Sequence, residues 1–194
     1  MPISVLFIQG AGQDAHATGR AMADGLQRAL GRHYKLAYPR MPGEYDPKPE
    51  AWKRTITLEA QACRADIIVA HSVGAAIVAD LLAAGGDAAL PQVQTAFLLA
   101  PPYIGRAGWP LGGYRLDALR ANPPAVKVGL FFYFGAADTV VPTSHAALYE
   151  QVFPRAAYRQ FSQCGHRFAG HLPLVAQDID TTARALGLRE PGRG

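Results

Sequence analysis

Short apolar runs alternate with helix-like segments along almost the whole sequence, and this alternation limits the possible folds more than any other feature. Six runs are expected to form strands, and most are apolar at successive positions: Ile3–Ile8, Tyr34–Ala37, Asp66–Ala70, Thr95–Leu99, Lys127–Phe134 and Ala157–Phe161. Continuous apolar strands are typical of sheets covered on both faces. Helical spacing or helix-start signals mark five segments between and after these runs: Thr18–Leu30, Glu50–Cys63, Ser72–Ala84, Pro142–Val152 and Leu172–Leu186. The pattern predicts an α/β fold in which a parallel sheet of about six strands lies between two layers of helices, a three-layer sandwich.

Two proline-rich segments interrupt the alternation and are expected to be loops. Tyr38–Pro49 holds four prolines, and Pro101–Pro124 is the longest connection and carries Tyr103, Trp109 and Tyr114. Long connections in compact domains are commonly functional, so Pro101–Pro124 is a candidate cover for a pocket. No repeat, low-complexity tract or linker divides the sequence, and residues 1–194 are predicted to form a single domain.

Composition excludes several classes of partner. The formal net charge of +4 comes largely from fifteen scattered arginines, with no run of three basic residues, so neither nucleic acid nor an anionic membrane surface is an expected partner. Cys63 and Cys164 are too few for a disulfide framework and lack the clustered partners of a zinc site. No apolar stretch is long enough to span a membrane, and the first residues do not resemble a signal peptide. A cytoplasmic protein without a metal is expected.

A serine follows the third expected strand, in the sequence Ala70-His71-Ser72-Val73-Gly74. A sharp strand-to-helix turn exposes such a serine at the carboxyl edge of a sheet, and it needs small residues two positions before and after. Glycine is usual at both places, so Ala70 is a departure. As an isolated pentapeptide, the pattern also fits a serine that only caps the helix.

Asp138 follows the fifth strand and His166 follows the sixth, so both are expected at the same edge of the sheet as Ser72. A serine needs a base to remove its proton, imidazole is such a base near neutral pH, and a buried carboxylate fixes the imidazole tautomer. Taken singly, Asp138 can be a turn residue and His166 an ordinary loop histidine. Taken together, in the order Ser, Asp, His, the three indicate a catalytic triad.

Acyl transfer also requires N–H donors for the oxyanion. Val73, next to the serine, supplies one in this interpretation. The second comes from the glycine-rich loop after the first strand, where Ala11 is the preferred candidate and Gly12 the alternative.

Other residues are candidates with ordinary structural alternatives. His71, Gly12, Tyr103, Trp109 and Phe168 can line a substrate pocket, although aromatic residues in such loops are as often simple packing. Four further histidines are expected on the surface or on helix faces: His16, His33, His145 and His171. Cys164 is either a reactive thiol or, more simply, a small buried side chain.

These segments resemble the α/β-hydrolase superfamily in a minimal form, and most of all the small serine hydrolases that include YdeN-like bacterial proteins and the retinoblastoma-binding serine hydrolase. The resemblance rests on the turn at Ser72, the stretch from Asp138 to Pro142 and Gly165-His166, and on three shorter pieces: Val5–Gly12, Tyr38–Pro42 and Ala100–Pro102. It implies that the first strand is second in the sheet. It also implies that Ser72, Asp138 and His166 are nucleophile, acid and base, and that no cofactor is needed.

The sequence therefore predicts a carboxylesterase-like serine hydrolase that acts on a small ester or related acyl compound through an acyl-enzyme. Short acyl chains are expected, because no large lid follows the fourth strand. Two alternatives stay open. One is a catalytically silent binding protein on the same fold. The other is an NADP-binding oxidoreductase, because Gly10-x-Gly12-x-x-Ala15 satisfies a dinucleotide fingerprint, although the second strand ends without the expected carboxylate. Transfer of the acyl group to an acceptor other than water, and the oligomeric state, are also left open.

Overall fold

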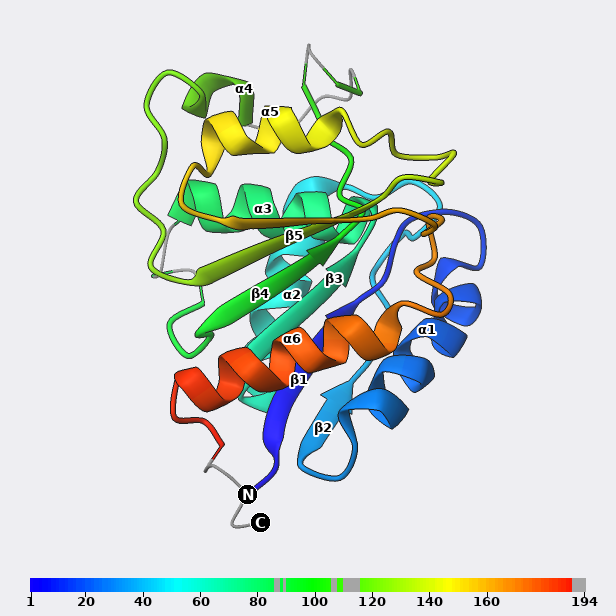
Figure 1. The fold of residues 1–194 in the computed structure, drawn as a ribbon. Coiled ribbons are helices and arrows are strands. Elements are labelled where there is room, and N and C mark those ends of the chain that lie inside the picture. Colours follow the sequence, from blue (N-terminus) through cyan, green and yellow to red (C-terminus); the bar gives the residue numbers. More distant parts are fainter. Residues whose placement is uncertain (86–87, 89, 106–107, 110–115, 190–194) are drawn as a thin grey trace.

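A six-stranded parallel sheet runs through the molecule in the order β2-β1-β3-β4-β5-β6 (Figure 1). The computed structural model describes residues 1–85, 88, 90–105, 108–109 and 116–189. Its strands are β1 (Ile3–Ile8), β2 (Tyr34–Ala37), β3 (Ile67–His71), β4 (Thr95–Leu99), β5 (Gly129–Gly135) and β6 (Ala157–Phe161). The predicted parallel sheet, with its first strand in second place, is confirmed.

Helices cover both faces of this sheet. They are α1 (Ala15–Leu30), α2 (Pro49–Cys63), α3 (Val73–Gly85), α4 (Leu116–Leu119), α5 (His145–Val152) and α6 (Leu172–Ala185). Helices α1 and α6 pack together on one face, and α2, α3 and α5 lie on the other (Figure 1). Right-handed crossovers account for this division, because the chain moves outward from β1 to β2 and then reverses direction to form β3.

The segment 101–124 departs from the expectation of an uninterrupted loop. It contains the short helix α4, and Ile104 and Trp109 form an isolated β-bridge before it. Tyr114, predicted within this loop, lies outside the described residues. Helix α5 begins at His145, three residues after the predicted start at Pro142, because residues 142–144 form a turn in which His145 N–H donates to Pro142 O (3.1 Å).

The core is densest around β3, β4 and α3. Helix α3 is buried at nearly every position, which its alanine-rich sequence permits against the sheet. Its one carboxylate, Asp80, is fully buried and pairs with Lys53 Nζ of α2 at 2.6 Å. Strand β6 is different, because as an edge strand it buries only Phe161. None of the helices in the described part of the chain has the length and hydrophobicity that crossing a bilayer requires.

The order of the strands creates a crevice at one edge. The chain leaves β1 toward β2 on one side and returns as β3 on the other, and open α/β sheets bind ligands at such a reversal. Because Ile8 is paired with Ala70, β1 and β3 end at the same level. The Gly10–Gly12 loop and Ser72 are therefore neighbours.

Candidate active site

The turn between β3 and α3 holds Ser72 in a left-handed backbone conformation, with φ of 54°. Such a conformation in a non-glycine residue costs about 1–3 kcal/mol and persists only where the surroundings impose it. Here Ser72 N–H donates to Leu99 O of β4 (2.8 Å). A Cβ at Gly74 would lie 2.1 Å from Gln9 O, so this position requires glycine. Ala70, where glycine is usual, is accommodated in the core.

The three residues predicted as a triad are in contact. Asp138 Oδ2 lies 2.8 Å from His166 Nδ1, and His166 Nε2 lies 3.1 Å from Ser72 Oγ. With the Nδ1 proton donated to the carboxylate, Nε2 is free to accept from the serine hydroxyl. The arrangement has the geometry that nucleophilic catalysis needs, namely a nucleophile on a base and a base on an orienting acid.

The Asp138 carboxylate is fixed by its own turn. Its other oxygen, Oδ1, accepts hydrogen bonds from Val140 N–H (2.7 Å) and Val141 N–H (2.9 Å). The side chain has no exposed surface. Oδ2 is thereby held toward the imidazole, while the backbone of the turn stabilises the negative charge.

His71 contacts His166 through a hydrogen bond and through its ring. Its Nε2–H donates to the backbone oxygen of His166 (2.8 Å), and the two ring centroids are 4.7 Å apart. Burial, followed by the charge of protonated His166, lowers the pKa of His71 to about 4. His71 is therefore neutral near pH 7 and serves as a fixed hydrogen-bond donor.

The backbone of the β1–α1 loop distinguishes the two residues considered for the second oxyanion donor. Gly12 N–H donates to Glu44 O at 2.7 Å and is not available. Ala11 N–H and Val73 N–H have no hydrogen-bond partner among the residues that the structure describes. Both flank Ser72, one across the crevice and one in the chain.

A small cavity of about 130 Å³ opens at Ser72. It is lined by the β1–α1 loop, one face of α1, the serine turn and the histidine loop: Gly10, Ala11, Ala15, Thr18, Gly19, Met22, His71, Ser72, His166 and Arg167. Gly12, predicted to line the pocket, is not among them, whereas His71 is. The α1 residues were not predicted. Ala15, Gly19 and Met22 recur at helical spacing directly after the glycine loop, and that spacing was the available signal.

Three predicted pocket residues lie elsewhere. Tyr103 is buried and its hydroxyl donates to Asp117 Oδ1 (3.0 Å), while Phe168 is buried in edge contact with Phe161. Trp109 packs edge-on against the ring of His145. Tyr103 is hydrogen-bonded to Asp117 of α4 and His145 of α5, and Trp109 contacts the same His145, so neither residue lines the cavity at Ser72.

Two other candidate side chains, His145 and Cys164, are buried in the structure. His145, expected on a surface or helix face, is instead buried; its Nδ1 accepts Tyr103 N–H (2.8 Å), and burial lowers its pKa. Cys164 is fully buried, and burial together with the nearby Asp138 raises the pKa of its thiol to about 11. The Cys164 thiol is therefore protonated and unreactive near neutral pH.

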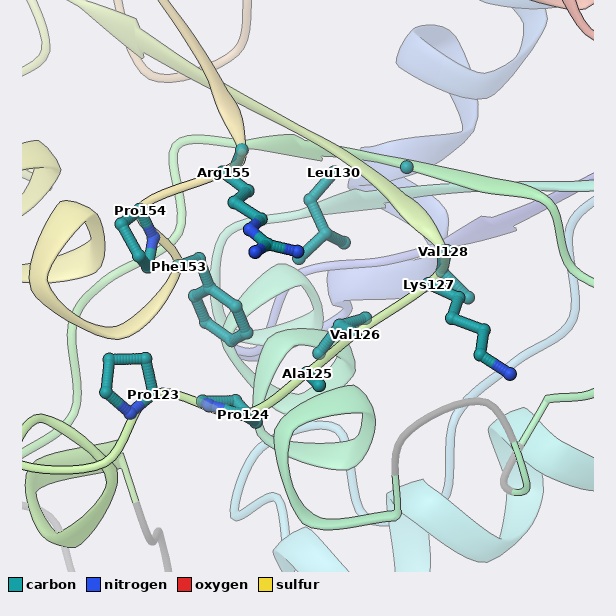
Figure 2. Close-up of a pocket in the computed structure, with 12 residues that line it drawn as sticks. Pro123, Pro124, Ala125, Val126, Lys127, Val128, Leu130, Phe153, Pro154 and Arg155 are labelled. Carbon is teal, nitrogen blue, oxygen red and sulfur yellow. The ribbon is translucent and has the colours of Figure 1, made fainter.

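A larger cavity, of about 680 Å³, lies at the opposite edge of the sheet. Figure 2 shows it between the segment that enters β5 and the one that enters β6. Among the described residues that line it, the ionisable ones are Lys127 and Arg155, so it lacks a nucleophile paired with a base. Across the described residues, no three His, Cys, Asp or Glu side chains are grouped as metal ligands would be.

Comparisons with known proteins bear on the family and the fold. A family model described as serine hydrolase matches residues 24–119. No curated protein sequence matches the chain. The product of the ydeN gene of B. subtilis is 17% identical, with a TM-score of 0.65 over 92% of this chain and 97% of that one.

Two further solved structures share the fold. The α/β-hydrolase enzyme MGS-MChE2, from a sediment metagenome of the Mar Chica lagoon, is 14% identical, with a TM-score of 0.72 over 96% of this chain and 93% of that one. The esterase domain of a Rhodothermus marinus protein is 18% identical, with a TM-score of 0.64 over 94% and 86% of the two chains. At these identities, the similarity establishes the fold.

Proposed function

We propose that this chain is a small serine hydrolase of the α/β-hydrolase superfamily that cleaves small carboxylic esters or related acyl compounds, with Ser72, His166 and Asp138 as its catalytic triad. The observation that carries the proposal is the continuous hydrogen-bonded series from Asp138 through His166 to Ser72. A protein that only binds its ligand has no need of a strained serine aimed at an imidazole that a buried carboxylate orients.

In the first half of the reaction, Ser72 Oγ attacks the ester carbonyl carbon while His166 Nε2 takes its proton. The carbonyl π electrons move to the oxygen, and the resulting oxyanion accepts hydrogen bonds from Val73 N–H and Ala11 N–H. As the tetrahedral intermediate collapses, the C–O bond to the alcohol breaks. The leaving oxygen takes the proton from His166, and the acyl group stays on Ser72 as an ester.

In the second half, water replaces the alcohol. His166 Nε2 takes a proton from the water as its oxygen attacks the acyl carbon, and collapse of the second intermediate returns that proton to Ser72 Oγ. Throughout, Asp138 stays ionised and stabilises the imidazolium that forms twice per cycle. One ester and one water are consumed, and the alcohol leaves before the acid.

The proposed substrate is small because the cavity at Ser72 is small. Its volume of about 130 Å³ corresponds to about four water molecules in the liquid, and pockets for drug-sized ligands are typically about 300–1,000 Å³. This space is too small to enclose a dinucleotide. The NADP alternative is further weakened because Gly12 N–H, which the fingerprint would offer to a phosphate, is already bonded to Glu44.

Intact-mass labelling with a fluorophosphonate tests the proposal. The probe forms a P–O bond to an activated serine and releases fluoride, so wild type should gain one adduct. Ser72→Ala should gain none. Ser162→Ala, which removes an exposed serine after β6, should be labelled like wild type. A folded wild-type sample that stays unlabelled would overturn the proposal and favour the binding protein.

A further inference from the structure

Glu44, in the proline-rich segment between β2 and α2, is hydrogen-bonded at three points to the chain between the end of β1 and the first turn of α1. Its carboxylate oxygen Oε2 accepts Gln9 Nε2–H and His16 N–H, both at 2.7 Å. Its backbone oxygen accepts Gly12 N–H, also at 2.7 Å. These three residues, Gln9, Gly12 and His16, lie before and after Ala11 in the chain, and the N–H of Ala11 is the proposed oxyanion donor.

Gln9, directly after β1, forms a further bond to this segment. It is fully buried, and its Oε1 accepts Met41 N–H (3.2 Å) from the same proline-rich segment. Both polar ends of the Gln9 side chain are thus hydrogen-bonded to residues 41–44, and its Nε2 also donates to Gly10 O (3.4 Å). A buried amide with fixed partners leaves the backbone around it little freedom to shift.

The Glu44 carboxylate also caps the start of α1, where the residue before the helix does not. Asp14 precedes α1 but makes no side-chain capping bond, and its φ is 52°. Glu44 caps the helix in its place through His16 N–H, where the helix dipole favours a negative charge. The hydrogen bond from Gln9 contributes most to holding the pKa of Glu44 below its usual value, so the carboxylate is ionised at neutral pH.

We infer that Glu44 is a positioning residue for the oxyanion hole, and that with Gln9 it holds Ala11 N–H at the distance from Ser72 that the transition state requires. The inference rests on the proposed function. Oxyanion donors act only when preorganised, because a donor that must move at the moment of reaction loses its advantage. The same carboxylate fixes the start of α1, and therefore also the wall of the cavity that Ala15 and Gly19 form.

Removing the carboxylate, and separately replacing it by an amide, distinguishes positioning from plain stability. Glu44→Ala removes the oxygen that accepts from Gln9 Nε2–H and His16 N–H. Glu44→Gln is the conservative variant, because its side-chain oxygen can still accept both hydrogen bonds although the negative charge is lost. Asp46→Asn is the matched control, because Asp46 is a 70%-exposed carboxylate in the same segment that pairs only with Lys48 among the described residues.

Turnover of p-nitrophenyl acetate is measured per active site, with active sites counted as fluorophosphonate adducts at saturation. Removing an oxyanion donor costs about 10²–10³ in kcat, so displacing one should cost Glu44→Ala about 10–100-fold, with KM nearly unchanged. Glu44→Gln should retain most of the wild-type kcat per site, and Asp46→Asn should match wild type. A role in stability alone would reduce the number of labelled sites but leave kcat per site intact.

Two results would overturn the inference: kcat per site within twofold of wild type in Glu44→Ala, or a loss in Glu44→Gln as large as the loss in Glu44→Ala. If Glu44→Ala does not fold, Glu44→Asp provides the comparison, since it keeps the charge but shortens the reach to His16 N–H and Gln9. An unchanged kcat per site in Glu44→Asp then overturns the inference. A wild type without labelling and turnover would overturn the proposed function itself, and the inference with it.

Discussion

The tautomer of His166 decides, at the scale of single residues, whether Ser72 can be activated. Asp138 sets that tautomer by accepting the Nδ1 proton at 2.8 Å. In Asp138→Asn, the amide oxygen can keep both bonds from Val140 and Val141, so the turn should fold normally. Its NH₂ group would then face Nδ1 and force the ring proton onto Nε2, which can no longer accept from the serine.

We therefore expect Asp138→Asn to lose about 10⁴ in kcat while retaining its thermal unfolding temperature within a few degrees. Steady-state kinetics on p-nitrophenyl acetate and a melting curve by circular dichroism measure both. Near-wild-type activity in a folded variant would mean that another group acts as the acid.

His71 should make the stability of the protein depend on pH. Its pKa is lowered from 6.5 to about 4 in the folded protein. Between pH 6.5 and pH 4, the imidazole is therefore protonated in the unfolded chain but stays neutral in the folded protein. Stability should be full above pH 6.5 and should fall as the pH drops toward 4, by up to about 3 kcal/mol from this group.

The comparison variant for this prediction is His71→Gln, whose amide can still donate to His166 O but does not titrate. Urea midpoints of both proteins at several pH values between 4 and 7 give the two dependences. A wild-type curve that parallels the variant would show that His71 protonates without cost.

At the scale of helices and strands, the buried pair of Lys53 and Asp80 holds α2 against α3. The Asp80 carboxylate has no exposed surface, and Lys53 Nζ, 2.6 Å away, is also bonded to the more exposed Glu50 (2.9 Å). Lys53→Met leaves a charge in the core without its cation, and breaking such a pair costs about 3–5 kcal/mol.

We expect Lys53→Met to lose that much free energy of unfolding, as measured by urea denaturation at pH 7. Glu50→Gln, which removes only the exposed partner, should cost less than about 1 kcal/mol. The double change Lys53→Met with Asp80→Leu should recover much of the loss, since it removes the stranded charge. An equal effect of both single changes would mean that the pair is solvated rather than buried.

The elements themselves were largely predictable from sequence, because local signals mark them. Continuous apolar runs identified the strands, and helical spacing with glycine at the end of α1 identified that helix within three residues at its start. Helix α4 was not predicted, since four residues carry no periodic signal. Strand β6 was recognised although its exposed edge position was not, because a sequence does not state which strand lacks a neighbour.

Within the candidate site, residues at strand ends were predictable and residues that act across the fold were not. Ser72, Asp138 and His166 each follow a strand, so topology alone brings them to one edge. Glu44 lies 28 residues from His16 along the chain, and nothing local in the segment 38–49 indicates that it caps α1. The aromatic residues Tyr103 and Phe168 suggested pocket walls by composition, but tertiary packing placed both in the core.

For the whole molecule, the small cavity at Ser72 is the feature that limits the size of the acyl group. A cavity of about 130 Å³ accepts an acyl group of a few carbons, and Met22, one of the residues that line it, is itself 7% exposed. The proposed hydrolase should therefore turn over acetate and butyrate esters of p-nitrophenol with the highest kcat/KM, and the value should fall steeply toward octanoate. Faster turnover of long chains than of short ones would contradict the size argument.

Met22→Ala tests whether the cavity sets this limit. The change shortens a side chain in the wall, so the optimum should shift toward longer acyl chains while acetate turnover changes little. Because Met22 also packs in the core, the variant should lose about 2–5 kcal/mol of stability, and assays belong well below its unfolding temperature. The matched control is Leu26→Ala, because Leu26 lies one turn further along α1, is fully buried and does not line the cavity. Leu26→Ala should destabilise the protein comparably without moving the chain-length optimum, and an optimum that shifts equally in both variants would trace the preference to general loosening rather than to the wall at Met22.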